Sequence, residues 1–109
     1  MCGIAGVVQR EGRLSDVPAL AASLGRALAH RGPDGSGVWQ EPDTSVLLVH
    51  RRLAIIDPGP GGAQPMATPD GRFHIVFNGE IYNYRALRAD LESHDERFPP
   101  AATPKSCCA

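Results

Sequence analysis

Apolar and polar positions along the chain follow two different periods, and together they predict an α+β domain. Residues 3–9 form a short apolar run of small and β-branched residues, which is typical of a buried strand. Further short apolar runs predict strands at 45–49, 53–56 and 73–77, with 81–82 as a continuation of the last. The polar residues between the second and third runs separate them into two strands.

Two other stretches have the spacing of amphipathic helices. The first runs over residues 16–30, with Ser15 or Asp16 as N-cap and Pro18 tolerated in the first turn. The second helix begins after Asn83, which is its predicted N-cap. The apolar positions that define these faces are Val17, Leu20, Ala21, Leu24 and Leu28 in the first helix and Tyr84, Leu87 and Leu91 in the second.

Glycine and proline mark two loops between these elements. Residues 30–37 contain three glycines and one proline, which indicates a shaped loop after the first helix. Residues 57–69 contain four prolines and three glycines and predict a long ordered loop. After Ser93 no period is visible, and the chain contains no internal repeat.

Length and charge limit the classes of function. A chain of 109 residues is expected to form one domain. Eleven Lys and Arg against twelve Asp and Glu give a net charge of −1, which argues against a nucleic-acid or anionic-membrane surface. No apolar run approaches the roughly 18–20 residues that cross a bilayer, and the N-terminus is unlike a secretory signal. We therefore expect a cytoplasmic protein with no nucleic-acid or membrane partner.

Cysteine and histidine are too sparse to predict a disulfide framework or a metal site. The cysteines lack a C-x-x-C spacing, and the histidines are scattered at wide intervals. We therefore expect no metal. These residues are Cys2, Cys107 and Cys108, and His30, His50, His74 and His94.

Cys2 is the first candidate for chemistry. Removal of Met1 would leave a thiol and a free α-amine on one residue. Their reference pKa values are about 8.5 and 7.7–8.0, so the amine can act as the base for the thiol near neutral pH. The alternative is that a cysteine at this position has no chemical role.

Asn78 and Gly79 follow the last predicted strand. A side-chain amide beside a glycine N–H that a substrate can approach closely could form an oxyanion hole. The alternative is a type I′ hairpin turn, for which Asn-Gly is the strongest short signal. Taken alone, this dipeptide favours the turn.

Charged side chains beside these loops are candidates for holding a substrate. Arg31, Arg51 and Arg52 have the planar guanidinium that binds a carboxylate bidentately. Glu80 could receive an ammonium group. The alternatives are ordinary surface arginines and a solvated hairpin charge.

Four motifs, read in order, carry a resemblance. They are Met-Cys-Gly-Ile-Ala-Gly at 1–6, His-Arg-Gly-Pro-Asp-Gly-Ser-Gly at 30–37, Arg-Leu-Ala-Ile-Ile-Asp at 52–57 and Asn-Gly-Glu-Ile-Tyr-Asn at 78–83. The series resembles the class II glutamine amidotransferase domain of the N-terminal-nucleophile hydrolase type. The second and fourth motifs are similar to the glutamine-hydrolysing asparagine synthetase branch. The resemblance covers residues 1–93.

The resemblance implies a fold and a reaction. The fold would be part of a four-layer αββα sandwich. Cys2, exposed by loss of Met1, would attack the side-chain amide of glutamine while its own α-amine handles the proton. Ammonia would leave, and water would hydrolyse the thioester to glutamate. Asn78 and Gly79 match the family's oxyanion hole and also belong to its substrate pocket.

The same resemblance implies how glutamine is held. Arg52 matches the arginine that binds the substrate α-carboxylate, and Glu80 matches a partner of the α-ammonium group. Arg31 lies in the loop that the family packs beside the nucleophile. The backbone of four consecutive residues lines the same pocket: Leu53, Ala54, Ile55 and Ile56.

The chain departs from the family after the second helix. A Ser-Asp-Thr-Glu-Val-Leu-Leu segment is due there, whereas residues 101–109 read Ala-Ala-Thr-Pro-Lys-Ser-Cys-Cys-Ala. Codons for Arg-Ser-Asp-Thr-Glu-Val-Leu-Leu-Arg can be chosen that give these nine residues when read one base later. We therefore hypothesise a frameshift between about residues 93 and 101. The predicted division is an amidotransferase part at 1–93 and an out-of-frame tail at 94–109.

The resemblance also implies a longer protein. The synthetase domain, which uses ATP and Mg²⁺, is absent from these residues, and no cofactor is expected in the part that is present. The predicted function is a glutaminase that supplies ammonia for ATP-dependent amidation of aspartate, with glutamine and the synthetase domain as partners. The alternatives are an inert truncated product of a frameshift, amidation of another carboxylate, and a non-catalytic amino-acid-binding module that uses Arg52 and Glu80.

Overall fold

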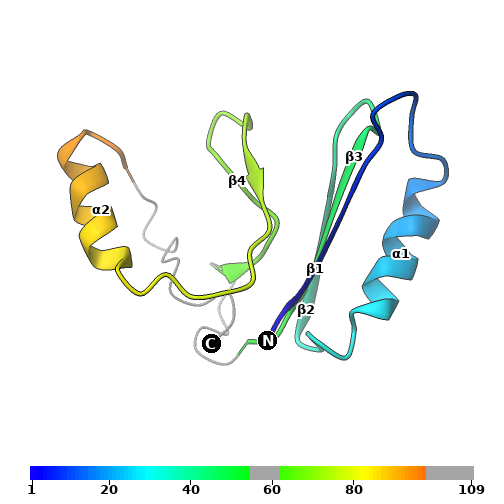
Figure 1. The fold of residues 1–109 in the computed structure, drawn as a ribbon, viewed down its shortest axis with the longest axis horizontal. Coiled ribbons are helices and arrows are strands. Elements are labelled where there is room, and N and C mark those ends of the chain that lie inside the picture. Colours follow the sequence, from blue (N-terminus) through cyan, green and yellow to red (C-terminus); the bar gives the residue numbers. More distant parts are fainter. Residues whose placement is uncertain (55–61, 98–109) are drawn as a thin grey trace.

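The computed structural model describes residues 1–54 and 62–97 and confirms the α+β class. These described residues form two antiparallel sheets and two helices (Figure 1). Their bounds are β1 Gly3–Val8, α1 Val17–Ala27, β2 Gly35–Gln40, β3 Val46–Arg52, β4 Met66–Ala67, β5 His74–Ile75 and α2 Tyr84–Ser93.

The larger sheet has the strand order β1-β3-β2, with β3 paired to a neighbour on both sides. The register places Gly3 and Ser36 opposite Arg51, and Ile4 opposite His50. Because successive side chains of a strand point to opposite faces, Arg51 lies on one face of this sheet. His50 and Arg52 lie on the other.

Helix α1 covers the Arg51 face of the sheet (Figure 1). Asp16 caps the helix, since its carboxylate accepts a hydrogen bond from the Ala19 N–H at 3.3 Å. The predicted apolar stripe of α1 is the side that packs on the sheet. The buried residues of this core are Val17, Leu47 and Val49, and Ala5, Val7, Leu14, Leu20, Ala21 and Leu24 pack against them.

The opposite face of the sheet is covered only in part. The β4-β5 hairpin lies against it at the β2 edge, where the rings of Trp39 and His74 stack with centroids 3.9 Å apart. At the β1 edge, Ile4 and Val8 remain 42% and 68% exposed. The apolar residues at the β1 edge of this face are therefore incompletely covered.

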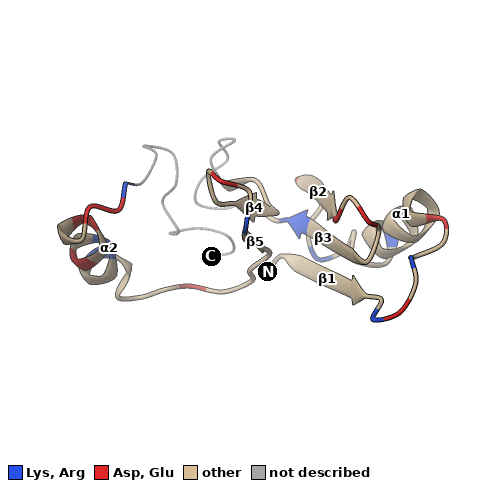
Figure 2. Ribbon diagram, turned by 90° about the horizontal axis from the view of Figure 1, so that it is seen from above, with Lys and Arg blue, Asp and Glu red and all other residues tan. Residues whose placement is uncertain are grey.

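Helix α2 stands apart from the sheet and buries none of its residues (Figures 1 and 2). Asn83 occupies the predicted N-cap position but makes no side-chain capping bond. Leu87 and Leu91, the apolar stripe of the helix, are 46% and 43% exposed. The period of the sequence thus predicted this helix correctly although its apolar side remains largely exposed.

Strand predictions were wrong where polar or glycine residues enter a strand. Residues 30–37 were predicted as loop, but β2 begins at Gly35 within them. Gly37 is needed there because Gln64 lies directly over it. β3 continues past the predicted end at residue 49 to Arg52, since buried His50 and Arg52 continue the pairing.

The later strands also differ from the prediction. The strand expected at 73–77 is limited to β5, and residues 81–82 form no strand. β4 lies inside the predicted loop 57–69 and pairs with β5. Residues 55–61 lie outside the described residues, so most of the strand expected at 53–56 and the start of that loop cannot be compared with it.

Candidate active site

Cys2 lies at the start of β1 and is completely buried. Its Sγ accepts a hydrogen bond from the Leu53 N–H at 3.3 Å and lies 3.9 Å from the Leu53 carbonyl oxygen. Leu53 and Phe77 pack against it. The sulfur is disulfide-bonded in this structure, so it becomes a nucleophile only when reduced. Cys2 thus contacts Leu53 of the third motif, and also Phe77, the residue before the fourth motif.

The second and third motifs are tied together by backbone contacts. The Asp34 N–H donates to the Arg52 carbonyl at 2.9 Å, and the Asp34 carboxylate accepts from the Ala54 N–H at 2.8 Å. Gly32 is required because a Cβ there would overlap the backbone of Arg51. A Cβ added to Gly3 would lie 3.2 Å from the Cβ of Arg31. The loop at 30–34 therefore packs beside Gly3, the residue that follows Cys2.

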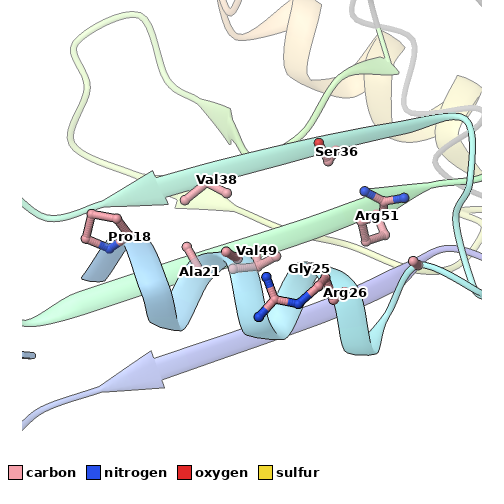
Figure 3. Close-up of a pocket in the computed structure, with 10 residues that line it drawn as sticks. Pro18, Ala21, Gly25, Arg26, Ser36, Val38, Val49 and Arg51 are labelled. Atoms are coloured by element: carbon pink, nitrogen blue, oxygen red, sulfur yellow. The ribbon is translucent and has the colours of Figure 1, made fainter. Parts of the chain in front are cut away.

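The three arginines occupy different surroundings. Arg52 is buried on the face away from α1, and its guanidinium packs so closely on Gly62 that a Cβ there would overlap it. Arg51 points to the α1 face, where its Nε donates to the Gly32 carbonyl at 3.0 Å. Together with Arg26 it borders a groove of about 600 Å³ between α1 and the strands β2 and β3 (Figure 3). Arg52 and Arg51 thus lie on opposite faces of β3.

A cavity of about 100 Å³ lies beside Arg52 on the face away from α1. Among the described residues, the buried Nε2 of His50 has no hydrogen-bond partner. Burial lowers the pKa of His50 from its usual value of 6.5, and the positive charge of Arg52 lowers the pKa further. The residues that line the cavity are Asp34, Gly35, Ser36, His50, Arg52, Ala63 and Gln64.

His50 should make the fold sensitive to acid. The lowered pKa means that the folded chain favours the neutral imidazole, whereas the unfolded chain protonates it near the usual pKa of 6.5. Its contribution to stability is complete above pH 6.5 and is lost as the pH falls toward the lowered folded pKa. The free energy of unfolding should therefore fall between pH 7.5 and 5.5, by at most about 1.4 kcal/mol per pH unit.

Urea unfolding at several pH values measures this effect. His50→Gln is the comparison, because a glutamine keeps a polar side chain that does not titrate. The free energy of unfolding of the variant should fall less steeply with decreasing pH than that of the parent chain, by up to about 1.4 kcal/mol per pH unit. Equal pH dependence of the two proteins would contradict the assignment.

Asn78 and Gly79 are half-buried and follow Phe77. The Phe77 ring lies 3.0 Å from the position that a Gly79 Cβ would take. The alternative of a hairpin turn is wrong, because no strand follows Gly79 in the described part of the chain. Glu80 is exposed. Ile55 and Ile56, the remaining predicted pocket residues, lie outside the described residues.

The motifs did not single out Gln64, and they gave His50 no role. Both side chains are buried and border the small cavity. Gln64 is hydrogen-bonded to the backbone of Phe77. The only signal in the sequence was a polar residue beside a proline in a glycine-rich segment, which is equally typical of an exposed turn.

Comparison with known proteins agrees with the four motifs. The sequence model of the glutamine amidotransferase domain matches residues 1–103. This chain belongs to the glutamine amidotransferase domain family. Within the described residues, no helix has the length and apolar character to cross a membrane.

Relatives come from plants, an amoeba and a bacterium. Asparagine synthetase [glutamine-hydrolyzing] 1 of Arabidopsis thaliana is 41% identical over 97 residues, which are 89% of this chain and 16% of that protein. The probable asparagine synthetase of Dictyostelium discoideum is 42% identical over 84% of this chain and 16% of its own length. Asparagine synthetase 1 of Bacillus subtilis is 40% identical over 90% of this chain and 15% of its own length. The chain thus spans about one sixth of these relatives.

Proposed function

We propose that this chain supplies the glutamine-hydrolysing chemistry of an asparagine-synthetase-like enzyme. One observation carries the proposal: the buried Cys2 sulfur lies against Leu53, next to Arg52, and against Phe77, next to Asn78. The first motif therefore contacts the third motif and the residue before the fourth, which supports a site built from Cys2, Arg52 and the Asn78–Gly79 pair. Membership of the glutamine amidotransferase domain family adds the substrate class.

The reaction begins when Cys2 has lost Met1 and is a reduced thiol. Its Sγ forms a bond to the side-chain amide carbon of glutamine, and the α-amine accepts the thiol proton. Asn78 and the Gly79 N–H stabilise the oxyanion of the tetrahedral intermediate. The amine then gives the proton to the departing nitrogen, so ammonia leaves and a thioester remains. Water hydrolyses the thioester, which releases glutamate and restores the thiol.

Arg52 holds the substrate α-carboxylate in this proposal, while Glu80 faces the α-ammonium group. The backbone at 53–56 completes the pocket. Arg52 is suited to the task because a buried guanidinium binds a carboxylate through two parallel hydrogen bonds. No cofactor takes part in this half of the reaction.

Arg52→Lys should raise the KM for glutamine by roughly 10–100-fold with a smaller change in kcat, because an ammonium cannot make the bidentate contact. Steady-state kinetics of ammonia release measure both constants. Arg51→Lys is the matched control, since the neighbouring arginine lies on the opposite face of β3. Equal effects of the two substitutions on KM would contradict the assignment of Arg52.

We infer that the described part of the chain belongs to a four-layer αββα sandwich. α1 would be one outer layer, the β1-β3-β2 sheet would be the next, and the β4-β5 hairpin would belong to the second sheet. Two features support this arrangement: the Trp39–His74 stack between the sheets and the exposed Ile4 and Val8 on the inner face.

In a protein of the relatives' length, the ammonia would pass to a synthetase domain that uses ATP and Mg²⁺ and amidates aspartate. The length of the relatives supports a larger enzyme. Amidation of another carboxylate is the alternative for the acceptor. The cytoplasm is the proposed location.

The decisive experiment uses the reduced chain with Met1 removed. Incubation with glutamine should release glutamate and ammonia in equal amounts, and rapid acid quenching should trap a glutamyl thioester on Cys2. Glutamine binding without turnover would support the amino-acid-binding module instead. Neither binding nor turnover would support the inert product.

We propose that residues 94–109 are read out of frame. The support is the one-base shift that converts the family's expected segment into residues 101–109. Sequencing of the gene from the codon of Leu91 onward tests this. A gained or lost base should restore Ser-Asp-Thr-Glu-Val-Leu-Leu, and an unbroken frame in repeated sequencing would contradict it.

A further inference from the structure

We propose that Gln64 is a positioning residue for the oxyanion hole. It stands outside all four motifs, yet its side chain is buried and bonded to the residue just before Asn78. This inference rests on the proposed glutamine hydrolysis, and it gives a role to a residue that touches neither substrate nor nucleophile.

The carboxamide of Gln64 pairs with both backbone groups of Phe77. Its Oε1 accepts a hydrogen bond from the Phe77 N–H at 2.6 Å, and its Nε2 donates to the Phe77 carbonyl at 3.2 Å. The opposite amide orientation would set donor against donor and acceptor against acceptor, so the pairing fixes the side chain. One glutamine therefore does for Phe77 what a neighbouring β-strand would do.

The register of the β4-β5 hairpin explains why a side chain takes this place. Met66 pairs with Ile75 and Ala67 pairs with His74, and the same register puts Gln64 opposite Phe77. Pro65 lies between Gln64 and Met66 and has no N–H to donate to a ladder. The backbone pairing of β4 with β5 ends at Met66. Beyond it, the Gln64 side chain takes the place of the backbone and bonds to Phe77, nearer to the site.

Phe77 connects this pairing to the chemistry. Phe77 packs against Cys2, and its ring lies 3.0 Å from the position that a Gly79 Cβ would take. A shift of the Phe77 backbone would move Asn78 and Gly79 relative to the Cys2 sulfur. Holding both the N–H and the carbonyl of Phe77 therefore fixes the distance between nucleophile and oxyanion donors.

Gln64 is itself held by the larger sheet. Its backbone lies over Gly37 of β2, where an added Cβ would come within 2.8 Å of the Gln64 carbonyl carbon. It also borders the small cavity shared with His50 and Arg52. The contacts thus run from the rigid sheet through Gln64 to Phe77 and the oxyanion hole.

Gln64→Ala should lower kcat for glutamine by roughly 10–100-fold, because small displacements of oxyanion donors have effects of this size. The change in KM should be smaller, since the residues proposed to hold the substrate remain. An aldehyde analogue of glutamine, which forms a tetrahedral oxyanion on Cys2, should lose affinity by about the same factor as kcat. Alkylation of Cys2 by iodoacetamide, which develops no such oxyanion, should keep its rate.

Two further variants separate positioning from general stability. Gln9→Ala removes another glutamine whose Nε2 donates to a backbone carbonyl, that of Glu11 at 2.8 Å, at the far end of β1. Its kcat should be unchanged. Gln64→Glu keeps an acceptor for the Phe77 N–H but repels the Phe77 carbonyl when ionised. Its kcat, divided by that of the parent chain at the same pH, should rise as the pH is lowered and the carboxyl regains a donor.

The outcomes distinguish this inference from the proposed function. If the parent chain is active and Gln64→Ala keeps its kcat and aldehyde affinity, the positioning role is overturned and glutamine hydrolysis stands. A parallel fall in the alkylation rate would also overturn it, since the loss would then be a general one.

If the reduced parent chain releases no ammonia, the proposed function fails, and amide hydrogen exchange decides the positioning role. Loss of the Gln64 side chain should speed exchange at Phe77, Asn78 and Gly79 at least tenfold relative to Gln9→Ala. Unchanged exchange at these amides would overturn the inference.

Discussion

Cys2→Ala is expected to reduce glutamine hydrolysis by at least about 10⁴-fold, the size typical of losing a catalytic nucleophile. The proposal places no other side chain to attack the amide carbon of glutamine. The measurement is release of ammonia and glutamate by the reduced chain without Met1. The trapped glutamyl thioester should disappear in the same variant.

Two variants control this experiment. Cys2→Ser keeps the geometry but provides a weaker nucleophile, so its rate should fall strongly. Cys108→Ala makes the same cysteine-to-alanine change outside the four motifs, and under reducing conditions its rate should match that of the parent chain. A Cys2→Ala chain that remains folded and keeps its glutaminase rate would disprove the mechanism.

The sequence correctly predicted the elements in which the spacing of apolar residues follows from burying one face. α1 and β1 are correct to within a few residues because the apolar residues of each pack on a single neighbour. α2 is correct because its period and its start signal agree, although its apolar stripe is exposed. Local pattern alone determines such elements.

The missed elements depend on contacts between distant segments. β2 was predicted as a glycine-rich loop. Its Gly37 is required because the backbone of Gln64 lies over it, and Gln64 is 27 positions further along the chain. β3 was predicted to end at residue 49, because His50 and Arg52 are polar although they are buried. A pattern of apolar residues does not reveal which polar residues will be buried.

The same distinction applies to the site. The motifs identified Cys2, Arg52, Asn78 and Gly79 by residue type, and the structure brings their segments to one region. The supporting contacts of Asp34 and Gln64 were not predicted. Their hydrogen bonds reach 20 and 13 positions along the chain, and a single sequence contains no record of such pairings.

Gly37→Ala should destabilise the fold by at least about 3 kcal/mol, because the new methyl group would overlap the backbone carbonyl of Gln64. Backbone cannot rotate away as a flexible side chain end can, so β2 and the 62–67 segment would have to separate. That separation would also pull Gln64 from Phe77. Chemical denaturation followed by circular dichroism measures the stability change, and glutamine hydrolysis should fall with it.

Gly25→Ala is the matched control, because it makes the same substitution with the opposite expectation. Gly25 lies inside α1, and a Cβ there would have no atom within 4 Å. Alanine restricts the unfolded chain and favours the helix, so stability should rise by about 0.5–1 kcal/mol. If both variants shifted stability in the same direction, glycine content rather than the Gln64 contact would explain the loss. Opposite signs would tie the effect to the contact between Gly37 of the larger sheet and Gln64, in the segment that leads to the proposed oxyanion hole.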